Sequence, residues 1–385
     1  MKMSILVMNS RLLIILILIS LSSNLVVAKK VKIIKSNYEI QQITSKFNRS
    51  KVLQQIQEFI FKSHPSRFVG TRGHLKSREY IYSQLKTLTQ KTDNESIIKQ
   101  EFTPNISKSI KMYKDDFQRE IVKKFNPKDS KYKKWDLITK KTISLIKSKK
   151  NIKGQNIIWR KEGYINQKKE LIIGAHYDNI SHNLITWLPE PTADTPGADN
   201  NATGVVLALN LIKVLSDIDL PFNISVVFFD FAELGFLGSD YYVNNLKIKK
   251  SNIVAFLNLE MLGHDTKDID MEKKLRNMRI YISKNTNPIN SKESKIAKKL
   301  RKLGRNITSA VNFKIIDNGF NASDHISFRE KNIPSLTFTQ SWDTDFNPLY
   351  HSSKDVPETL NSQTYLLSTK YIIGATLAFL FDINS

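Results

Sequence analysis

Two histidines and three carboxylates in this sequence lie where a parallel sheet would place them at one edge. His176 follows the apolar run ELIIGA, Glu233 follows ISVVFFD after a short turn, and Glu260 follows IVAFLNL. Asp199 lies in the loop PGADNN, and His351 lies in NPLYHSSKD. Side chains at the carboxyl ends of parallel strands meet in one crevice. Imidazoles and carboxylates are ligands of zinc, and a shared carboxylate can hold two ions roughly 3.5–4 Å apart.

Each of these residues also has a simpler interpretation. A lone histidine is more often a surface or core residue than a ligand, and a lone Asp before a helix is more often an N-cap. Their joint placement at one sheet edge favours a metal site. Asp178 lies two residues beyond His176, where a carboxylate could orient the imidazole and raise its basicity as an outer partner. The alternative for Asp178 is an ordinary turn residue.

The elements that must position these residues follow from hydrophobic periodicity. From residue 155 onward, apolar runs typical of strands alternate with helical patterns, which indicates a mainly parallel mixed sheet sandwiched by helices, an α/β fold. Strands are predicted at residues 155–160, 170–175, 224–230, 253–259, 278–283 and 334–339. Helices are predicted at residues 51–62, 74–88, 202–216, 236–245, 291–303 and 362–381.

The N-terminus has the pattern of a secretory signal at residues 1–28. Lys2 and Arg11 precede the apolar run at 12–21, and the small residues Val26-Val27-Ala28 follow it. We therefore expect a secreted or periplasmic protein without stable membrane insertion after cleavage; the alternative is anchoring by an uncleaved signal. Residues 29–50 are expected to be loosely held. Residues 51–385 are expected to form one domain with an exposed Lys-rich insertion at about 105–150.

Composition restricts the function further. The chain has no cysteine, so no disulfide supports the fold and the core and metal must do so. Its formal net charge is +23, and lysines are spread along the whole sequence. A general solvated basic surface explains this distribution better than a nucleic-acid site, so no nucleic-acid partner is expected. Oligomeric state cannot be read from the sequence.

Taken in order, the motifs resemble a known family: the two-zinc exopeptidases that include bacterial leucyl aminopeptidases, glutamate carboxypeptidase and glutaminyl cyclases. The matching segments are HPSRFVGTRGHLKSREYI, AHYDN, PGADNNATGV, FFDFAELGFLGS, LNLEMLG, ASDHISFREKNIPS and DFNPLYHSSKDVPETL. The resemblance implies a zinc aminopeptidase-like fold (phosphorylase/hydrolase-like α/β/α) and zinc as cofactor, with two ions expected. It implies as ligands His176, Asp199 as the bridging carboxylate, Glu233, Glu260 and His351. It also implies a peptide substrate with a free N-terminus, from which single residues are cut.

Two positions depart from the family pattern. The family usually has two adjacent glutamates in the third motif, the first being the general base, and here the pair is Ala232-Glu233. A positioned general base typically contributes about 10²–10⁴-fold in rate, roughly 3–5 kcal/mol, so efficient turnover is not expected. Asp230, the nearest candidate in sequence for a replacement base, is not expected to take that role. Glu260 stands where the family generally has Asp, which makes a single zinc ion the alternative to two.

Three functions remain open at this point. The first is an exported zinc aminopeptidase. The second is a catalytically impaired or inactive relative that uses the metal to bind peptides. The third is a glutaminyl cyclase, which has no advantage from the sequence because its chemistry also relies on the missing glutamate.

Overall fold

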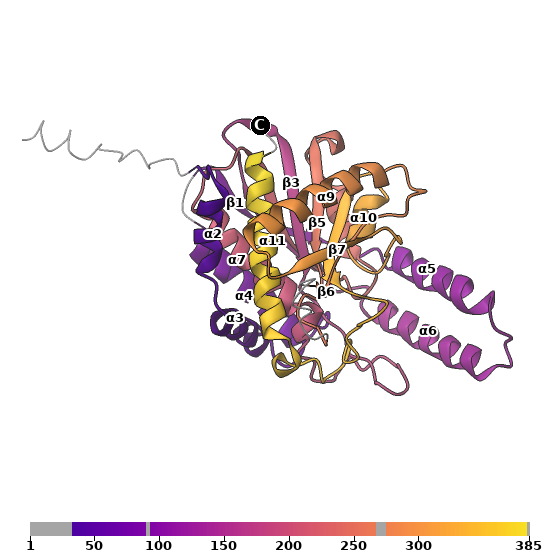
Figure 1. Ribbon diagram of the computed structural model, residues 1–385. Helices are drawn as coiled ribbons and strands as arrows, with labels where there is room; N and C mark the ends of the chain where they lie inside the picture. The colour runs from indigo at the N-terminus through magenta and orange to yellow at the C-terminus, as the bar shows by residue number, and fades with distance from the viewer. Residues whose placement is uncertain (1–32, 90–92, 267–274, 383–385) are drawn as a thin grey trace, which may run out of the picture. The chain divides into compact units, whose positions relative to one another are not determined.

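A computed structural model of the chain describes residues 33–89, 93–266 and 275–382 (Figure 1). The predicted signal peptide lies outside the described residues. Within the described part, eight strands form one mixed sheet in the order β1-β2-β4-β3-β5-β8-β6-β7. The strands are β1 (Glu95–Phe102), β2 (Gly154–Lys161), β3 (Asn166–His176), β4 (Phe222–Phe229), β5 (Ile253–Leu259), β6 (Leu275–Tyr281), β7 (Asn312–Ile316) and β8 (Ser335–Gln340).

The centre of the sheet is parallel. Strand β3 pairs in parallel with β4 on one side and with β5 on the other, and β5 pairs in parallel with β8. Strands β6 and β7 are also parallel to each other, whereas β1–β2, β2–β4 and β6–β8 are antiparallel. The predicted mainly parallel mixed α/β sheet is confirmed.

Both faces of the sheet are buried, which is why its central strands read as continuous apolar runs. Successive residues of β4 alternate between two cores. Val226 and Phe228 pack in the large core on one face, and Val227 and Phe229 pack in a smaller core on the other. The layer over the smaller core contributes Tyr242 and Phe328, among others.

Helices cover the sheet, and several of them begin at a residue whose side chain caps them. Asn48 accepts a hydrogen bond from the backbone of Lys51 at the start of α3, and Thr71 accepts one from His74 at the start of α4. The helices are α2 (Asn37–Ser45), α3 (Arg49–Lys62), α4 (Arg72–Leu88), α5 (Ile106–Phe117), α6 (Ser130–Ser148), α7 (Thr203–Ser216), α8 (Leu237–Asn244), α9 (Asn290–Ile307), α10 (His325–Arg329) and α11 (Ser362–Asp382). Short π-helical turns span Gln118–Val122 and Ala198–Ala202, and 3-10 turns span Lys250–Asn252 and Pro357–Thr359.

The N-terminal segment differs from the expectation that residues 29–50 are loose. Residues Asn37–Ser45 form helix α2, which Ser36 caps by accepting from the backbone of Glu39. Ile40 is buried in the large core, and α2 packs against α9 and α11. The segment is too polar to be recognised as a core helix by composition, but its few apolar side chains share one face.

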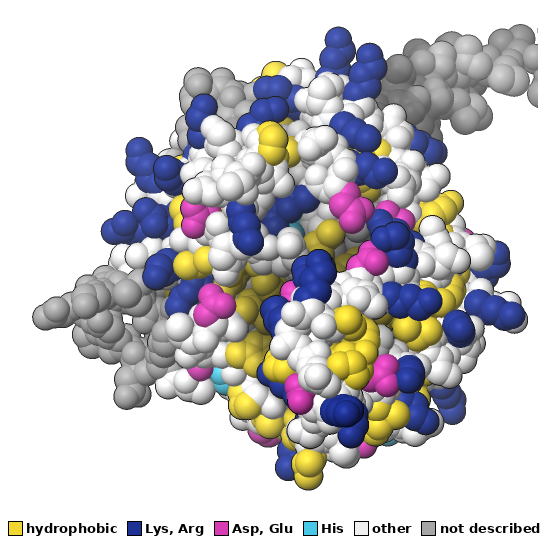
Figure 2. All heavy atoms as spheres, turned by 90° about the vertical axis from the view of Figure 1, so that its right-hand side faces the viewer, with side chains coloured by type: hydrophobic (Ala, Val, Ile, Leu, Met, Phe, Trp, Pro, Cys, Tyr) yellow, Lys and Arg dark blue, Asp and Glu magenta, His cyan; other side chains and the backbone are white. Residues whose placement is uncertain are grey.

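The Lys-rich insertion forms a hairpin of α5 and α6, joined by the turn Gln118–Val122 and extending away from the sheet (Figure 1). At its base the hydroxyl of Ser109 donates to the carbonyl of Leu234 at 2.5 Å, and the hydroxyl of Tyr113 donates to the carbonyl of Glu233 at 3.1 Å. On the face shown in Figure 2, Lys and Arg side chains are spread out, with Asp and Glu among them. We refer to residues Ile106–Ser148 below as the arm.

Helix α11 is the one helix in the described part that is long and apolar enough to cross a bilayer by length and composition alone. Of its apolar window, 89% is buried inside the protein. Tyr371 and Leu377 are fully buried and belong to the large core. Such burial on all sides is typical of a helix in the core of a folded protein.

Candidate metal centre

The predicted ligands come from the carboxyl edge of the three central parallel strands. His176 is the last residue of β3, Glu233 follows β4 after a turn, and Glu260 directly follows β5. His351 comes from the loop between β8 and α11, and all four side chains are at least largely buried. The structure brings these four residues together as two imidazole–carboxylate pairs.

The first pair consists of His176 and Glu260. The Nε2 atom of His176 lies 3.2 Å from Oε1 of Glu260. The other ring nitrogen, Nδ1, lies 3.0 Å from the backbone carbonyl oxygen of Asp178. Because a carbonyl only accepts, Nδ1 carries the proton and donates it, so Nε2 is left as the atom that faces the carboxylate. The second carboxylate oxygen of Glu260 accepts from the hydroxyl of Ser323 at 2.6 Å.

The second pair consists of Glu233 and His351. The Nε2 atom of His351 lies 2.8 Å from Oε2 of Glu233, and the ring stacks on Tyr350 with centroids 3.6 Å apart. The other oxygen, Oε1, accepts from the side-chain amide of Asn200 at 2.6 Å. Burial alone would raise the pKa of Glu233, but His351, His176 and the Asn200 amide together lower it to about 2. Glu233 is therefore a carboxylate at neutral pH.

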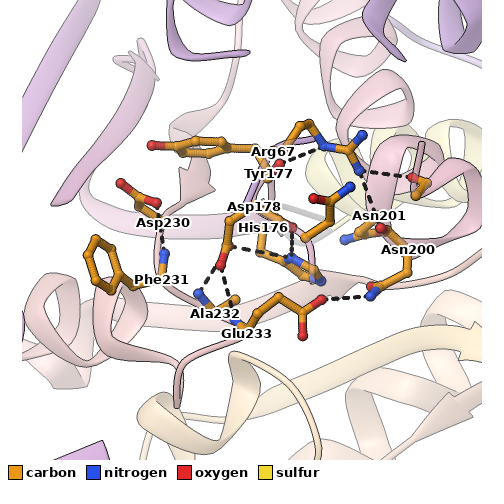
Figure 3. Close-up of polar contacts among 12 residues, drawn as sticks. Arg67, His176, Tyr177, Asp178, Asn200, Asn201, Asp230, Phe231, Ala232 and Glu233 are labelled. Carbon is orange, nitrogen blue, oxygen red and sulfur yellow. Dashed lines mark hydrogen bonds and ion pairs between the residues drawn. The ribbon is translucent and has the colours of Figure 1, made fainter. Parts of the chain in front are cut away.

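Asp178 contacts the site differently from the sequence-based expectation. Its carboxylate accepts from the backbone amides of Ala232 at 3.0 Å and Glu233 at 3.1 Å, so it fixes the turn that carries the second pair (Figure 3). The carboxylate oxygen lies 3.7 Å from Nδ1 of His176, beyond hydrogen-bonding distance. The His176 ring is oriented by the Asp178 backbone carbonyl instead of its side chain.

Asp199, the predicted bridging carboxylate, forms its contacts elsewhere. One carboxylate oxygen accepts from the backbone amide of Gly263 at 2.8 Å and the other accepts from the side-chain amide of Asn347 at 3.0 Å. Burial and the nearby carboxylate of Asp355 raise the pKa of Asp199 to about 8, against the opposing effect of these two hydrogen bonds. The residue whose side chain reaches the second pair is its neighbour Asn200 (Figure 3).

Asp230 lies two residues before Ala232 but is not free to accept a proton. Asp230 is fully engaged, since it accepts from His74, Arg78 and the backbone amide of Gln155. Burial alone would raise the pKa of Asp230, but His74 and Arg78 hold it far below its usual range. Asp230 is therefore a structural anion.

Asp324 is a buried acid that the sequence analysis gave no role. Its side chain is fully buried, and both carboxylate oxygens lack a hydrogen-bond partner within the described residues. Burial raises its pKa to about 7, with His176 opposing the rise. No spacing in the sequence distinguishes it from the adjacent polar residues of the segment ASDH.

Arg67 is a second residue that the sequence did not single out. Its buried guanidinium donates to the carbonyls of Tyr177, Pro196 and Gly197, and thereby ties the first ligand strand to the loop of Asn200. A basic residue followed by a Gly-rich turn in HPSRFVGTRG gives no sign of such a role, because its partners lie about 110–130 positions further along the chain.

Backbone strain marks the same region. Phe231, Met261 and His351 have positive φ values of 57°, 45° and 56°. Positive φ is unfavourable for bulky side chains and clusters at functional sites in folded proteins. Each of these residues is a predicted ligand or lies within two residues of one, which supports the assignment of this edge as the functional site.

The donor atoms of each pair are of the types that bind zinc. Imidazole nitrogens and carboxylate oxygens bind zinc at about 2.0–2.2 Å, so two of them on one tetrahedral ion lie about 3.3 Å apart. The His176–Glu260 separation of 3.2 Å matches, and the Glu233–His351 separation of 2.8 Å is shorter. Among the described residues, no group of three or more His, Asp or Glu side chains surrounds a common point.

Comparison with known proteins identifies a family for the chain. Residues 156–376, more than half of the chain, match the model of peptidase family M28. The aminopeptidase YwaD of Bacillus subtilis is 26% identical over 231 residues, 58% of this chain and 41% of the relative. A probable leucine aminopeptidase 1 of Trichophyton verrucosum is 24% identical over 212 residues, 53% of this chain and 52% of the relative. The chain thus spans about half or less of the length of these curated relatives.

Solved structures show the same fold at low sequence identity. A zinc aminopeptidase of Bacillus subtilis, BSAP, superposes with a TM-score of 0.60 and 17% identity, over 88% of this chain and 97% of that one. A glutaminyl cyclase of Bacteroides thetaiotaomicron superposes with a TM-score of 0.58 and 15% identity, over 87% and 98% of the two chains. With the fold, the ordered motifs and the family match in agreement, the chain belongs to peptidase family M28.

Proposed function

We propose that this protein is a metallopeptidase of the aminopeptidase type that binds zinc and peptides with a free N-terminus, and that it hydrolyses them slowly. The observation that supports the proposal is the pair of buried imidazole–carboxylate contacts, His176–Glu260 and Glu233–His351, at the carboxyl edge of β3, β4 and β5. The names of the relatives, aminopeptidases and zinc metalloproteases, point to the same reaction class.

The chain's own residues define what the site can do. Zinc bound there would polarise a peptide carbonyl and lower the pKa of a bound water. Asp178 fixes the backbone of Glu233, and the Asp178 carbonyl fixes the ring of His176. Residue 232 carries only a methyl group and cannot accept a proton.

The rate should reflect that missing acceptor. A positioned general base contributes about 10²–10⁴-fold, so we expect turnover reduced by roughly 3–5 kcal/mol relative to a site with the glutamate. Asp230 does not compensate, because its oxygens hold His74, Arg78 and the backbone of Gln155.

An assay with aminoacyl-anilides and short peptides tests this function. Purified protein with zinc should release the N-terminal residue slowly, a chelator should stop the release, and Ala232→Glu should increase the rate by about 10²-fold or more. His176→Ala is the matched loss-of-ligand control and should be inactive. Activity that survives both chelation and His176→Ala would refute the mechanism.

A second candidate, a metal-dependent peptide-binding protein without turnover, is favoured by two neutral groups in the site, the Ala232 methyl and the Asn200 amide. Calorimetric titration separates it from the first. Binding of a free-amino peptide but not its N-acetyl form, with no product after prolonged incubation, supports the second candidate. Cyclisation of a peptide with N-terminal Gln would instead indicate the glutaminyl cyclase reaction.

Export remains part of the proposal. The supporting observation is the charged, apolar and small-residue order within residues 1–28. Mature protein recovered from the source should begin at Lys29. Intact Met1 in the membrane fraction would show an uncleaved anchor instead.

A further inference from the structure

Helix α9 presents a row of cations to solvent. Its buried side, which includes Ala297, Leu300 and Ile307, packs in the large core next to α11 (Figure 1). Residues three or four positions apart lie on the same side of a helix. On the exposed side this spacing is occupied entirely by basic residues, which we call the α9 stripe: Lys292, Lys295, Lys298, Lys302 and Arg305.

The fold does not neutralise the α9 stripe. Glu293 is the single acid of the helix, and it is fully buried on the opposite side. Its carboxylate accepts from the backbone amides of Ser283 at 2.6 Å and Ser335 at 2.9 Å, and it pairs with Arg329 at 3.3 Å. Within residues 33–89, 93–266 and 275–382, no ion pair reaches a side chain of the stripe.

The arm, which is also rich in lysine, is different. Acids are spread among its cations, and Lys111, Lys124 and Lys140 each pair with an acid four residues away. Like charges at a spacing of three or four residues repel one another and destabilise a helix. Helix α9 retains this repulsion over its whole length, which leaves a concentrated positive potential at the surface.

Two cavities open along the stripe, and both have a basic and apolar lining. The first, of about 490 Å³, combines Lys292 and Lys295 with Lys250 and Lys331 from the loops that precede β5 and β8. The second, of about 890 Å³, combines the other half of the stripe with Lys35. No described acidic side chain lines either cavity.

Apolar residues complete these linings. They include Ile253, Ile296 and Pro334 in the first cavity and Leu303 and Phe381 in the second. A phosphate joined to an apolar molecule can contact both the lysines and these side chains. A small soluble anion would use only the lysines. The linings therefore favour an anionic amphiphile, and the length of the stripe favours a surface made of many such molecules.

The N-terminal end of the described chain lies at the same place. Ile34 lines the second cavity together with Lys298 and Lys302. The apolar run of the predicted signal, residues 12–21, ends 12 residues before Ile33, a reach of about 40 Å for an extended chain. A bilayer that holds this run during export is therefore within reach of the α9 stripe.

We propose that the α9 stripe and its two cavities dock the protein on an anionic phospholipid surface, with the lysines binding headgroup phosphates. The apolar side of α9 stays in the core, so the docking is peripheral and electrostatic, without insertion. First-cavity residues adjoin the amino ends of β5 and β8, the edge opposite the metal centre. The inference goes beyond the proposed function and does not depend on it.

Vesicle co-sedimentation tests the proposal. Protein starting at Lys29 contains the whole compact unit of residues Ile33–Ser385 and lacks the apolar run. It should bind phosphatidylcholine vesicles that contain phosphatidylglycerol, bind pure phosphatidylcholine at least 10-fold more weakly, and dissociate as salt increases. Equal binding to both kinds of vesicle would overturn the proposal.

Variants locate the surface. One lysine near an anionic membrane strengthens binding about fivefold. The triple variant Lys295→Gln/Lys298→Gln/Lys302→Gln should therefore bind anionic vesicles about 10²-fold more weakly, and Lys→Arg at the same positions should restore binding. Because Gln removes repulsion along the helix, the unfolding temperature of the Gln variant should not fall, which separates lost binding from misfolding.

A matched control removes the same charge from the arm. Lys133→Gln/Lys141→Gln/Lys147→Gln replaces three exposed lysines of α6 and should weaken vesicle binding less than about threefold. Equal weakening by both triple variants would show that only net charge matters, and would reject the α9 stripe.

Two soluble probes distinguish the membrane from other anions. Displacement of the protein from vesicles by millimolar glycerol 3-phosphate would assign the lysines to a small phosphate ligand. Tighter binding to a single-stranded oligonucleotide than to anionic vesicles, lost in the α9 variant, would assign them to a nucleic acid. Either result would overturn docking on a lipid surface.

Discussion

Replacing Arg67 by Met should destabilise the protein and disturb the metal centre together. The buried guanidinium donates to the carbonyls of Tyr177 at 2.8 Å, Pro196 at 2.5 Å, Gly197 at 2.9 Å and Asn200 at 3.3 Å. A methionine keeps most of the volume, including packing over Phe59, but none of the donors.

The magnitude follows from these contacts. Leaving a buried acceptor without a partner costs about 1–3 kcal/mol, so the three short bonds amount to about 3–9 kcal/mol. Part of this is offset, because burial lowers the pKa of Arg67 to about 10 despite Asp355, Asp178 and Glu233, and the variant no longer buries that charge. The offset is about 3 kcal/mol. The difference is about 0–6 kcal/mol, and we expect a net loss near its middle, about 3 kcal/mol, close to the cost of breaking buried charged contacts.

Urea unfolding followed by circular dichroism measures the loss, and zinc content measures the disturbance of the loop that carries Asn200. Arg67→Lys is the graded control. One ammonium group retains the charge but cannot reach all the carbonyls in the fixed fork of a guanidinium, so an intermediate loss is expected. A cost below about 1 kcal/mol for Arg67→Met, with unchanged zinc content, would show that water satisfies these carbonyls and that Arg67 does not organise the site.

Three other outcomes follow from the same structure. Removing zinc with a chelator should lower the unfolding temperature, because free zinc at 100 times its dissociation constant stabilises the folded state by about 2.7 kcal/mol; an unchanged temperature would mean that no zinc is held. Burial, together with Arg329, keeps the pKa of His325 well below 6.5. As the pH falls, the unfolded chain therefore binds a proton at this residue before the folded protein does. The stability present above pH 6.5 is lost by up to about 1.4 kcal/mol per pH unit. His325→Gln, which can still donate to the Phe320 carbonyl, should flatten that loss in unfolding curves measured between pH 7.5 and 5, and an equally steep loss in the variant would assign it to other groups. Asp178→Asn should cost about 1–2 kcal/mol, since one of the backbone amides of Ala232 and Glu233 loses its acceptor; equal stability in calorimetry would contradict this.

Periodicity was sufficient to predict the central elements. The runs that became β2, β3, β4, β5, β6 and β8 are apolar because both faces of the sheet are covered, and α4, α7 and α11 follow the spacing of their buried side chains. Strands β1 and β7 were missed. Both lie at the edges of the sheet, and the burial of β1 alternates irregularly between half-exposed and exposed residues, so its sequence lacks a clear pattern.

The order of the strands in the sheet could not be predicted from the sequence either. Strands β2 and β3 are consecutive in sequence, yet β4 lies between them, in parallel with β3 and antiparallel to β2. A pairing of this kind depends on how the whole core closes and not on the residues of one strand.

The positions of candidate ligands could be predicted where they directly follow regular strands. They could not be predicted where they lie in an irregular turn. His176 and Glu260 could be located from the ends of β3 and β5. The choice between Asp199 and Asn200 could not, because neighbouring side chains in an irregular turn point in different directions. Asn200 (φ −104°, ψ 92°) and Asn201 (φ −131°, ψ 44°) are both non-helical within the turn Ala198–Ala202, and the Asn200 amide donates to Glu233. Residue type favoured Asp199 as the side chain beside Glu233, whereas the backbone geometry places the side chain of Asn200 there.

The arm has a mechanical consequence for the reaction centre. Helix α6 has 19 residues, which at 1.5 Å per residue makes a rod of about 28 Å. Its partner α5 is hydrogen-bonded near its base to the turn that carries Glu233: the hydroxyls of Tyr113 and Ser109 donate to the carbonyls of Glu233 and Leu234. A displacement of the distal end of the arm is therefore transmitted through these hydrogen bonds to the turn that carries the Glu233 carboxylate.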